Sequence, residues 1–266
     1  MHITNAGTSS IGVNTVVYGG FVNYSTADSV LIVTGSNTVN IISDIMGGLL
    51  PTPYGDSVSI RNSGIVNITG SIAGYSRQGV IVDTISGGTI NISGSIRGNY
   101  IRVGGGNISY GIVINTNKTI NIIGNVSSEA GSNGNGIVIN GNVIIDIKGN
   151  VFNNASTTLN ALTLSTGTST LTITGSIYQF PTSTATTIIN IGGTSCNVRI
   201  SGSITSGNTS VAINHATAGT SSIIGPISAS LSSAGVSFTS ATHFLSATGP
   251  FYNKITIMLY TLKTYN

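Results

Sequence analysis

Aromatic and arginine side chains recur at one place in a pattern that repeats along the sequence. Each copy of the pattern is marked by a glycine, and tyrosine or phenylalanine follows that glycine by three to six residues in several copies. The aromatic residues and the arginines near them are Tyr24, Tyr75, Arg77, Arg97, Tyr100, Arg102, Tyr178 and Phe180. Aromatic faces and guanidinium groups together suit stacking on sugar rings and hydrogen bonding to hydroxyl groups. The set is therefore a candidate glycan-binding surface.

A structural interpretation of the same side chains is favoured over glycan binding. Rings at this position can cover the edges of coils or pack between subunits. The chain contains no tryptophan, and this absence counts against a dedicated sugar-binding cleft. Glycan binding stays open as the alternative.

Acidic residues are too few and too scattered to indicate a catalytic pair. The six of them are Asp28, Asp44, Asp56, Asp83, Glu129 and Asp146. Glycoside hydrolysis by the common route needs two carboxyl groups roughly 5–10 Å apart, and these six fall at different positions of the repeat. Only Asp28 and Asp56 lie where neighbouring coils could bring them together. We expect no enzyme, and a polysaccharide-cleaving site only if a second subunit completes it.

The histidines and the single cysteine give no metal-binding pattern. His2, His215 and His243 occupy different positions of the repeat, and Cys196 has no histidine stacked beside it. We therefore expect neither a metal nor a cofactor. The cysteine is interpreted as a small buried apolar residue.

These residues must be positioned by a repeat that runs through most of the chain. The motif reads apolar, polar, apolar, variable, glycine, small, apolar. Its glycine, or the residue in that place, recurs at Gly19, Ser43, Gly70, Gly94, Gly124, Gly149, Gly175, Gly202, Gly225 and Gly249. A second apolar segment precedes most of these positions. A period of about 25 residues with two or more strands in each copy is typical of a β-solenoid.

Alternation within the motif assigns the faces of the strands. Two rows are expected to point inwards and to stack as aliphatic ladders. The first row is Ile68, Ile92, Ile122, Ile147, Ile173 and Ile200, and the second is Ile72, Ile96, Val126, Val151, Ile177 and Ile204. An outward row is expected at Asn40, Asn67, Asn91 and Asn121, continued by Asp146, Thr172 and Arg199. Asparagines in such a row can form hydrogen bonds from coil to coil.

We therefore predict an all-β fold, a single-stranded right-handed parallel β-helix of about ten coils of roughly 25 residues. Residues 15–252 are expected to form the β-helix. Residues 1–14 are expected to be an N-terminal cap, and residues 253–266 a C-terminal cap or an association segment. Caps are needed because each end coil exposes an unpaired edge.

Charge is sparse and unevenly distributed. Charged residues make up 6% of the chain, where about 25% is usual. No run of lysine or arginine suggests nucleic-acid binding, and no apolar segment is long enough to span a membrane. No charged residue lies between Arg199 and Lys254. An uncharged surface of that extent predicts packing against copies of the chain or against another protein.

The repeated NI-T/S-G-SI and NI-I-G-NV segments resemble those of parallel β-helix proteins of the phage fibre and tailspike type. Adhesins of the filamentous-haemagglutinin or autotransporter type are the second choice. The resemblance is architectural and covers residues of about 15–251. It implies a non-enzymatic structural virion component (a phage fibre, tail or capsid-decoration protein), homotrimeric, with other virion proteins or a host surface glycan as partners.

The choice between a virion and a bacterial cell surface depends on the N-terminal residues. The opening MHITNAGTSS has neither a basic nor an apolar signal region. Because surface adhesins normally carry a signal sequence, we expect localisation in a virion, with an adhesin or glycan-binding β-helix on a bacterial surface as the alternative. A polysaccharide depolymerase with an inter-subunit site is the second alternative.

Overall fold

The computed structural model describes the repeated part of the chain in segments. The described residues are 2–5, 9–12, 17–18, 31–47, 57–74, 79–83, 85–98, 110–128, 134–153, 160–179, 187–192, 195–206, 211–215, 218–228, 234–238, 243–247 and 251–252. All of the assigned secondary structure in these segments is β-strand. No helix long and apolar enough to cross a membrane occurs among them.

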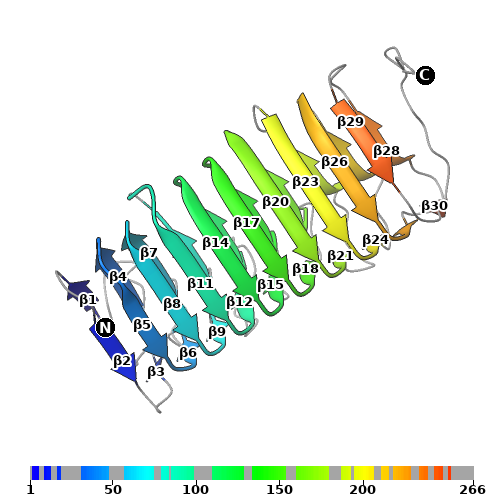
Figure 1. The fold of residues 1–266 in the computed structure, drawn as a ribbon. Coiled ribbons are helices and arrows are strands. Elements are labelled where there is room, and N and C mark those ends of the chain that lie inside the picture. The colour runs from blue at the N-terminus through cyan, green and yellow to red at the C-terminus, as the bar shows by residue number, and fades with distance from the viewer. Residues whose placement is uncertain are drawn as a thin grey trace.

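Three parallel sheets of ten strands each run the length of the described chain, and each coil contributes one strand to each sheet (Figure 1). The first sheet contains β1 (His2–Asn5), β4 (Leu31–Gly35), β7 (Val58–Asn62), β10 (Val80–Val82), β13 (Ile112–Ile114), β16 (Ile137–Ile139), β19 (Leu162–Leu164), β22 (Thr187–Ile191), β25 (Val211–His215) and β28 (Ala234–Phe238). The second contains β2 (Ser9–Gly12), β5 (Val39–Ile42), β8 (Ile65–Thr69), β11 (Thr89–Ser93), β14 (Lys118–Ile123), β17 (Val143–Lys148), β20 (Thr168–Thr174), β23 (Ser195–Ser201), β26 (Ala218–Ile224) and β29 (His243–Ala247). The third contains β3 (Val17–Tyr18), β6 (Ile45–Met46), β9 (Ile72–Ala73), β12 (Ile96–Gly98), β15 (Val126–Ser128), β18 (Val151–Asn153), β21 (Ile177–Gln179), β24 (Ile204–Ser206), β27 (Ile227–Ser228) and β30 (Phe251–Tyr252).

This arrangement confirms the predicted parallel β-helix. In Figure 1 the second-sheet strands on the near side run downwards while the chain advances to the upper right, which is the sense of a right-handed coil. Right-handed crossovers are the rule between parallel strands. The repeated motif contains two strands, not one, because the chain bends at its glycine and the short apolar end of the motif forms the third sheet.

The solenoid extends further towards the N-terminus than the sequence indicates. β1 pairs with β4 and β2 pairs with β5, so the first coil begins at His2, within the segment predicted as a cap. Residues 253–266, predicted as a C-terminal cap or association segment, lie outside the described residues.

The two predicted inward rows are buried and belong to different sheets. Ile68, Ile92 and their equivalents form one row of the second sheet, and Ile72, Ile96 and theirs form one row of the third sheet. Every member of both rows has 2% of its surface exposed or less. Each fully buried Ile or Val stabilises the fold by about 1.5–3 kcal/mol, so a core without disulfides is sufficient.

Part of the outer face of the first sheet is also buried. Val113 and Val138 point away from the core by alternation, yet they are 6% and 9% exposed, and Ser59 in the same row is 2% exposed. This burial explains why these strands have three apolar residues in succession, since a strand covered on both faces does not alternate.

Glycine is required where the second sheet turns into the third. Gly94 has φ +155°, and a Cβ built on it would lie 2.1 Å from the carbonyl oxygen of Gly70 in the preceding coil. Gly124, Gly149, Gly175, Gly202 and Gly225 meet the equivalent oxygen at 2.1–2.2 Å. Successive coils therefore approach backbone to backbone at this corner, which leaves no room for a side chain.

Side chains with oxygen acceptors follow the corner glycine. Asn125 Oδ1 accepts the backbone N–H of Asn150 (2.9 Å), and Asn150 Oδ1 accepts that of Ser176 (2.8 Å). The Oγ of Ser176 accepts the N–H of Ser203 (3.1 Å) in the same way. The polar residue after the corner glycine therefore links these successive coils through a backbone N–H.

Replacement of Gly94 by alanine is expected to destabilise the protein by about 3 kcal/mol, because the new Cβ meets the Gly70 carbonyl and the backbone is strained. Gly192→Ala is the matched control, since its Cβ would have no neighbour closer than 3.6 Å. Thermal unfolding followed by circular dichroism measures both variants. Equal unfolding temperatures for the two would contradict the close approach of the coils.

Candidate functional site

The structure describes two of the eight candidate glycan-binding residues, Arg97 and Tyr178. The other six, Tyr24, Tyr75, Arg77, Tyr100, Arg102 and Phe180, lie outside the described residues. Both described residues are the second residue of a third-sheet strand, Arg97 in β12 and Tyr178 in β21. They therefore belong to the same outward row.

The row places an aromatic pair on the third sheet. Tyr178 in β21 is in register with Phe152 in β18, and the two rings stack with centroids 5.3 Å apart and planes 10° from parallel. Tyr178 is 37% exposed. A stacked pair of this kind contributes about 0.5–1.5 kcal/mol beyond its buried area. The exposed part of the Tyr178 ring leaves aromatic surface accessible on this face.

Arg97 does not join this pair. Its neighbours in the row are Ala73 on one side and Ser127 on the other. Two further strands, β15 and β18, separate it from β21, so Arg97 and Tyr178 are roughly 14 Å apart along the sheet. The two described candidates thus share a surface without forming one compact site.

Phe152 is a member of the aromatic surface that the sequence analysis missed. It follows Gly149 by three residues, the same spacing that separates Tyr178 from Gly175. A comparison of the residues three positions after each corner glycine therefore identifies Phe152 from the sequence.

The described carboxylates are distributed over different coils and sheets. Asp44 follows β5 and accepts the backbone N–H of Ser71 through Oδ1 at 2.7 Å. Asp83 follows β10 in the first sheet, and Asp146 lies in the outward row of β17. Asp28, Asp56 and Glu129 lie outside the described residues. The described acidic residues thus form no pair suited to glycoside hydrolysis.

Potential metal ligands are equally dispersed in the part of the chain that the structure describes. No group of three or more histidine, cysteine, aspartate or glutamate side chains occurs there. Cys196 is in no disulfide and has 0% of its surface exposed, as expected for a small core residue.

A buried lysine, Lys118, is the most unusual group of the described chain. It occupies an inward position at the start of β14, in register with Val143, and is 4% exposed. Its ammonium group donates hydrogen bonds to the backbone carbonyls of Asn62 and Gly87. Burial lowers the pKa of Lys118, because the charged form loses its hydration. Alternation with Ile120 and Ile122 is the signal in the sequence that marks this lysine as inward.

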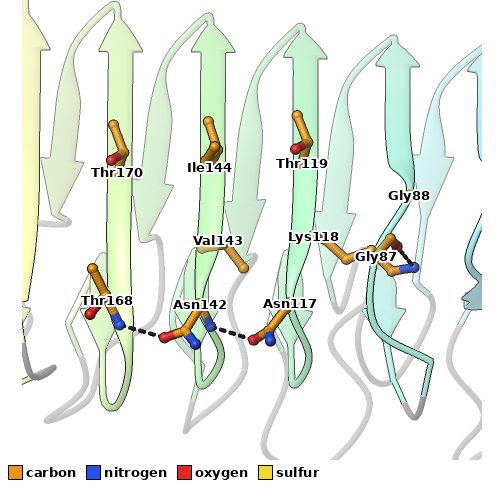
Figure 2. A pocket seen from close by; sticks show the side chains of 10 residues that line it. All are labelled: Gly87, Gly88, Asn117, Lys118, Thr119, Asn142, Val143, Ile144, Thr168 and Thr170. Atoms are coloured by element: carbon orange, nitrogen blue, oxygen red, sulfur yellow. Dashed lines mark hydrogen bonds between the residues drawn. The ribbon is translucent and has the colours of Figure 1, made fainter.

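A shallow depression of about 430 Å³ lies beside Lys118, across the starts of β14, β17 and β20 (Figure 2). Side-chain oxygens link these coils, because Asn117 Oδ1 accepts the N–H of Asn142 at 2.9 Å and Asn142 Oδ1 accepts that of Thr168 at 2.6 Å. The lining consists of Gly87, Gly88, Asn117, Lys118, Thr119, Asn142, Val143, Ile144, Thr168 and Thr170. This lining includes no carboxylate, imidazole or thiol to act as a general base, and the amine points to backbone carbonyls.

Comparison with known proteins identifies no relative of this chain. No model of a protein family matches it, and searches of curated proteins and of solved structures give no significant match. The parallel β-solenoid architecture is established by the structure itself.

The buried lysine makes the stability of the protein depend on pH in a definite direction. Since the pKa of Lys118 is lower in the folded chain than the unfolded value of 10.5, the unfolded state binds more protons between the two values. Stability therefore rises as the pH increases through that window. We expect the free energy of unfolding of the native protein, relative to that of Lys118→Met, to increase as the pH rises through the alkaline range. Denaturant unfolding of both proteins at several pH values measures this difference. A difference independent of pH would contradict this assignment.

Proposed function

We propose that this chain is a non-enzymatic structural component of a virion, as a fibre, tail or capsid-decoration protein, which contributes to attachment at a host surface. The observation that carries the proposal is the continuity of three ten-stranded sheets along the chain. Such a solenoid has a uniform cross-section and extends in one direction. This geometry suits a protein that spans a distance between a particle and a surface.

The use of the side chains supports the same proposal. Inward positions stack as aliphatic rows, the corner carries glycines, and the small residue after it bonds to the next coil. The described carboxylates Asp44, Asp83 and Asp146 lie on different coils. Since a fold alone does not define a function, these details matter more than the architecture.

A glycan-binding adhesin of a bacterial surface is the second candidate. The stacked pair of Phe152 and Tyr178 favours it, because an exposed ring beside a second ring offers a platform for a sugar. The two candidates share the solenoid and differ in whether the aromatic surface binds a ligand.

The structural proposal predicts a stable assembly without catalysis. Light scattering after size-exclusion chromatography should give a multiple of the 26.9 kDa chain mass. A trimer, implied by the resemblance to phage fibres, has three times this mass. A monomer at every concentration would contradict the assembly, and release of reducing ends from bacterial polysaccharides would favour a depolymerase instead.

The adhesin candidate predicts that Tyr178 contributes to sugar binding. In a glycan array followed by calorimetry on the best ligand, Tyr178→Ala should weaken binding at least about tenfold, because the exposed ring of the pair is lost. Arg61→Ala on the first sheet is the control, as Arg61 is exposed and lies on another face. Absence of any glycan ligand, or equal affinity of both variants, would leave the purely structural role.

A further inference from the structure

The outer face of the second sheet carries three rows of side chains from β8 to β26, and its central row begins one strand earlier, in β5. We refer to these rows together as the second-sheet face. Its central row contains the asparagines 40, 67, 91 and 121, then Asp146, Thr172, Arg199 and Ser222. Isoleucines of the flanking rows are among the most exposed apolar residues that the structure describes, with Ile123 at 59%, Ile144 at 58% and Ile224 at 42%. Exposed apolar side chains in a regular array indicate a surface that packs against a partner.

The charges of the central row are symmetric about one strand. Asp146 in β17 and Arg199 in β23 lie in register with Thr172 of β20, one strand to either side of it. The two charged residues are therefore roughly 10 Å apart along the solenoid axis.

The row of hydrogen-bonded asparagines ends beside Asp146. Two acceptors, Asn121 Oδ1 and the Asp146 carboxylate, are neighbours there. Nδ2 of each asparagine donates to Oδ1 of the preceding one, from Asn121 to Asn91 (2.8 Å), from Asn91 to Asn67 (2.7 Å) and from Asn67 to Asn40 (2.7 Å). The Nδ2 of Asn121 thus points away from Asp146, whose carboxylate can only accept. A cationic group bound to Asp146 offsets the repulsion between these two acceptors.

We propose that the second-sheet face binds a second copy of this chain in an antiparallel dimer, with its two-fold axis along β20. A two-fold axis parallel to the strands through Thr172 exchanges the positions of β17 and β23. It places Asp146 opposite Arg199 of the partner subunit, and Arg199 opposite the partner's Asp146. Two sheets packed face to face lie about 10 Å apart, a gap that an arginine and an aspartate side chain span together.

The same axis pairs exposed isoleucines. β14 and β26 lie two strands to either side of β20, and Ile123 and Ile224 occupy the same flanking row in these strands. Ile123 is therefore opposite the partner's Ile224, and this contact also occurs twice. One symmetry operation thus satisfies a charged contact and an apolar contact. It also places the exposed Lys148 of β17 opposite the partner's Ser201, and Ile144 opposite the partner's Asn197.

Two other face-to-face arrangements lack this complementarity. An axis along β17 places Asp146 opposite its own copy, and a parallel dimer about the central row does the same for Asp146 and Arg199. Like charges in direct opposition disfavour both arrangements. The region from β14 to β26 measures roughly 24 Å by 20 Å, so the dimer buries about 1,000 Å² in total, the lower limit for a specific interface. β11 and β29 are opposite each other in the same arrangement and add to this area.

Charge exchange tests the proposal. The native protein should have twice the chain mass of 26.9 kDa by sedimentation equilibrium at low salt. Asp146→Arg and Arg199→Asp should each weaken dimerisation by about a hundredfold, since each puts like charges in opposition. The double variant D146R/R199D should restore the native dissociation constant, and Arg61→Asp on the first sheet is the control that should leave it unchanged.

A native trimer would overturn the antiparallel dimer and leave the structural virion function standing, whereas a native monomer would contradict both. Failure of the double variant to recover would also overturn the pairing. Should a charge variant fail to fold, Thr172→Cys provides an independent measurement. Its thiols lie across the axis from each other, so a short bis-maleimide should cross-link the dimer at this position, and the absence of a cross-linked product would contradict the placement of the axis.

Discussion

Close approach of the backbone at one corner of each coil is the constraint on which the rest of this structure depends. The carbonyl of one corner glycine occupies the space that a side chain of the next would need, as for Gly70 and Gly94. This contact holds successive coils in one register. The aliphatic rows and the outward polar rows align because the corner leaves no freedom to slip, since a slip by one residue would reverse every side chain.

Stacked rows explain how a chain with so little charge maintains a defined structure. Polar side chains are placed where they bond to their equivalents in neighbouring coils, as Asn67 does to Asn40. A buried ammonium group at Lys118 is satisfied by two backbone carbonyls instead of a carboxylate. The described fold therefore depends on repeated hydrogen bonds and on burial, and its few charges are available to define surfaces.

Much of the fold could be predicted from the sequence because the repeat is periodic. Alternation identified both inward rows and the asparagine row, and the glycine spacing identified the coils. The third sheet could not be predicted as a separate sheet, because strands as short as β9 and β12 are too short to show an alternation of inward and outward residues. Phe152 has the same spacing from its corner glycine as Tyr178 and could have been predicted from it. Its contact with Tyr178 could not, because only the stacking of coils brings the two rings together.

Register also determines how such a chain can change in length. Each coil contacts mainly the coil before and the coil after it, so duplication of one whole coil reproduces every contact at both new junctions. Loss or gain of a few residues is tolerated between strands, where the spacing of the corner glycines already varies from coil to coil. Evolution or engineering can therefore lengthen this rod only in whole-coil steps of roughly 4.8 Å.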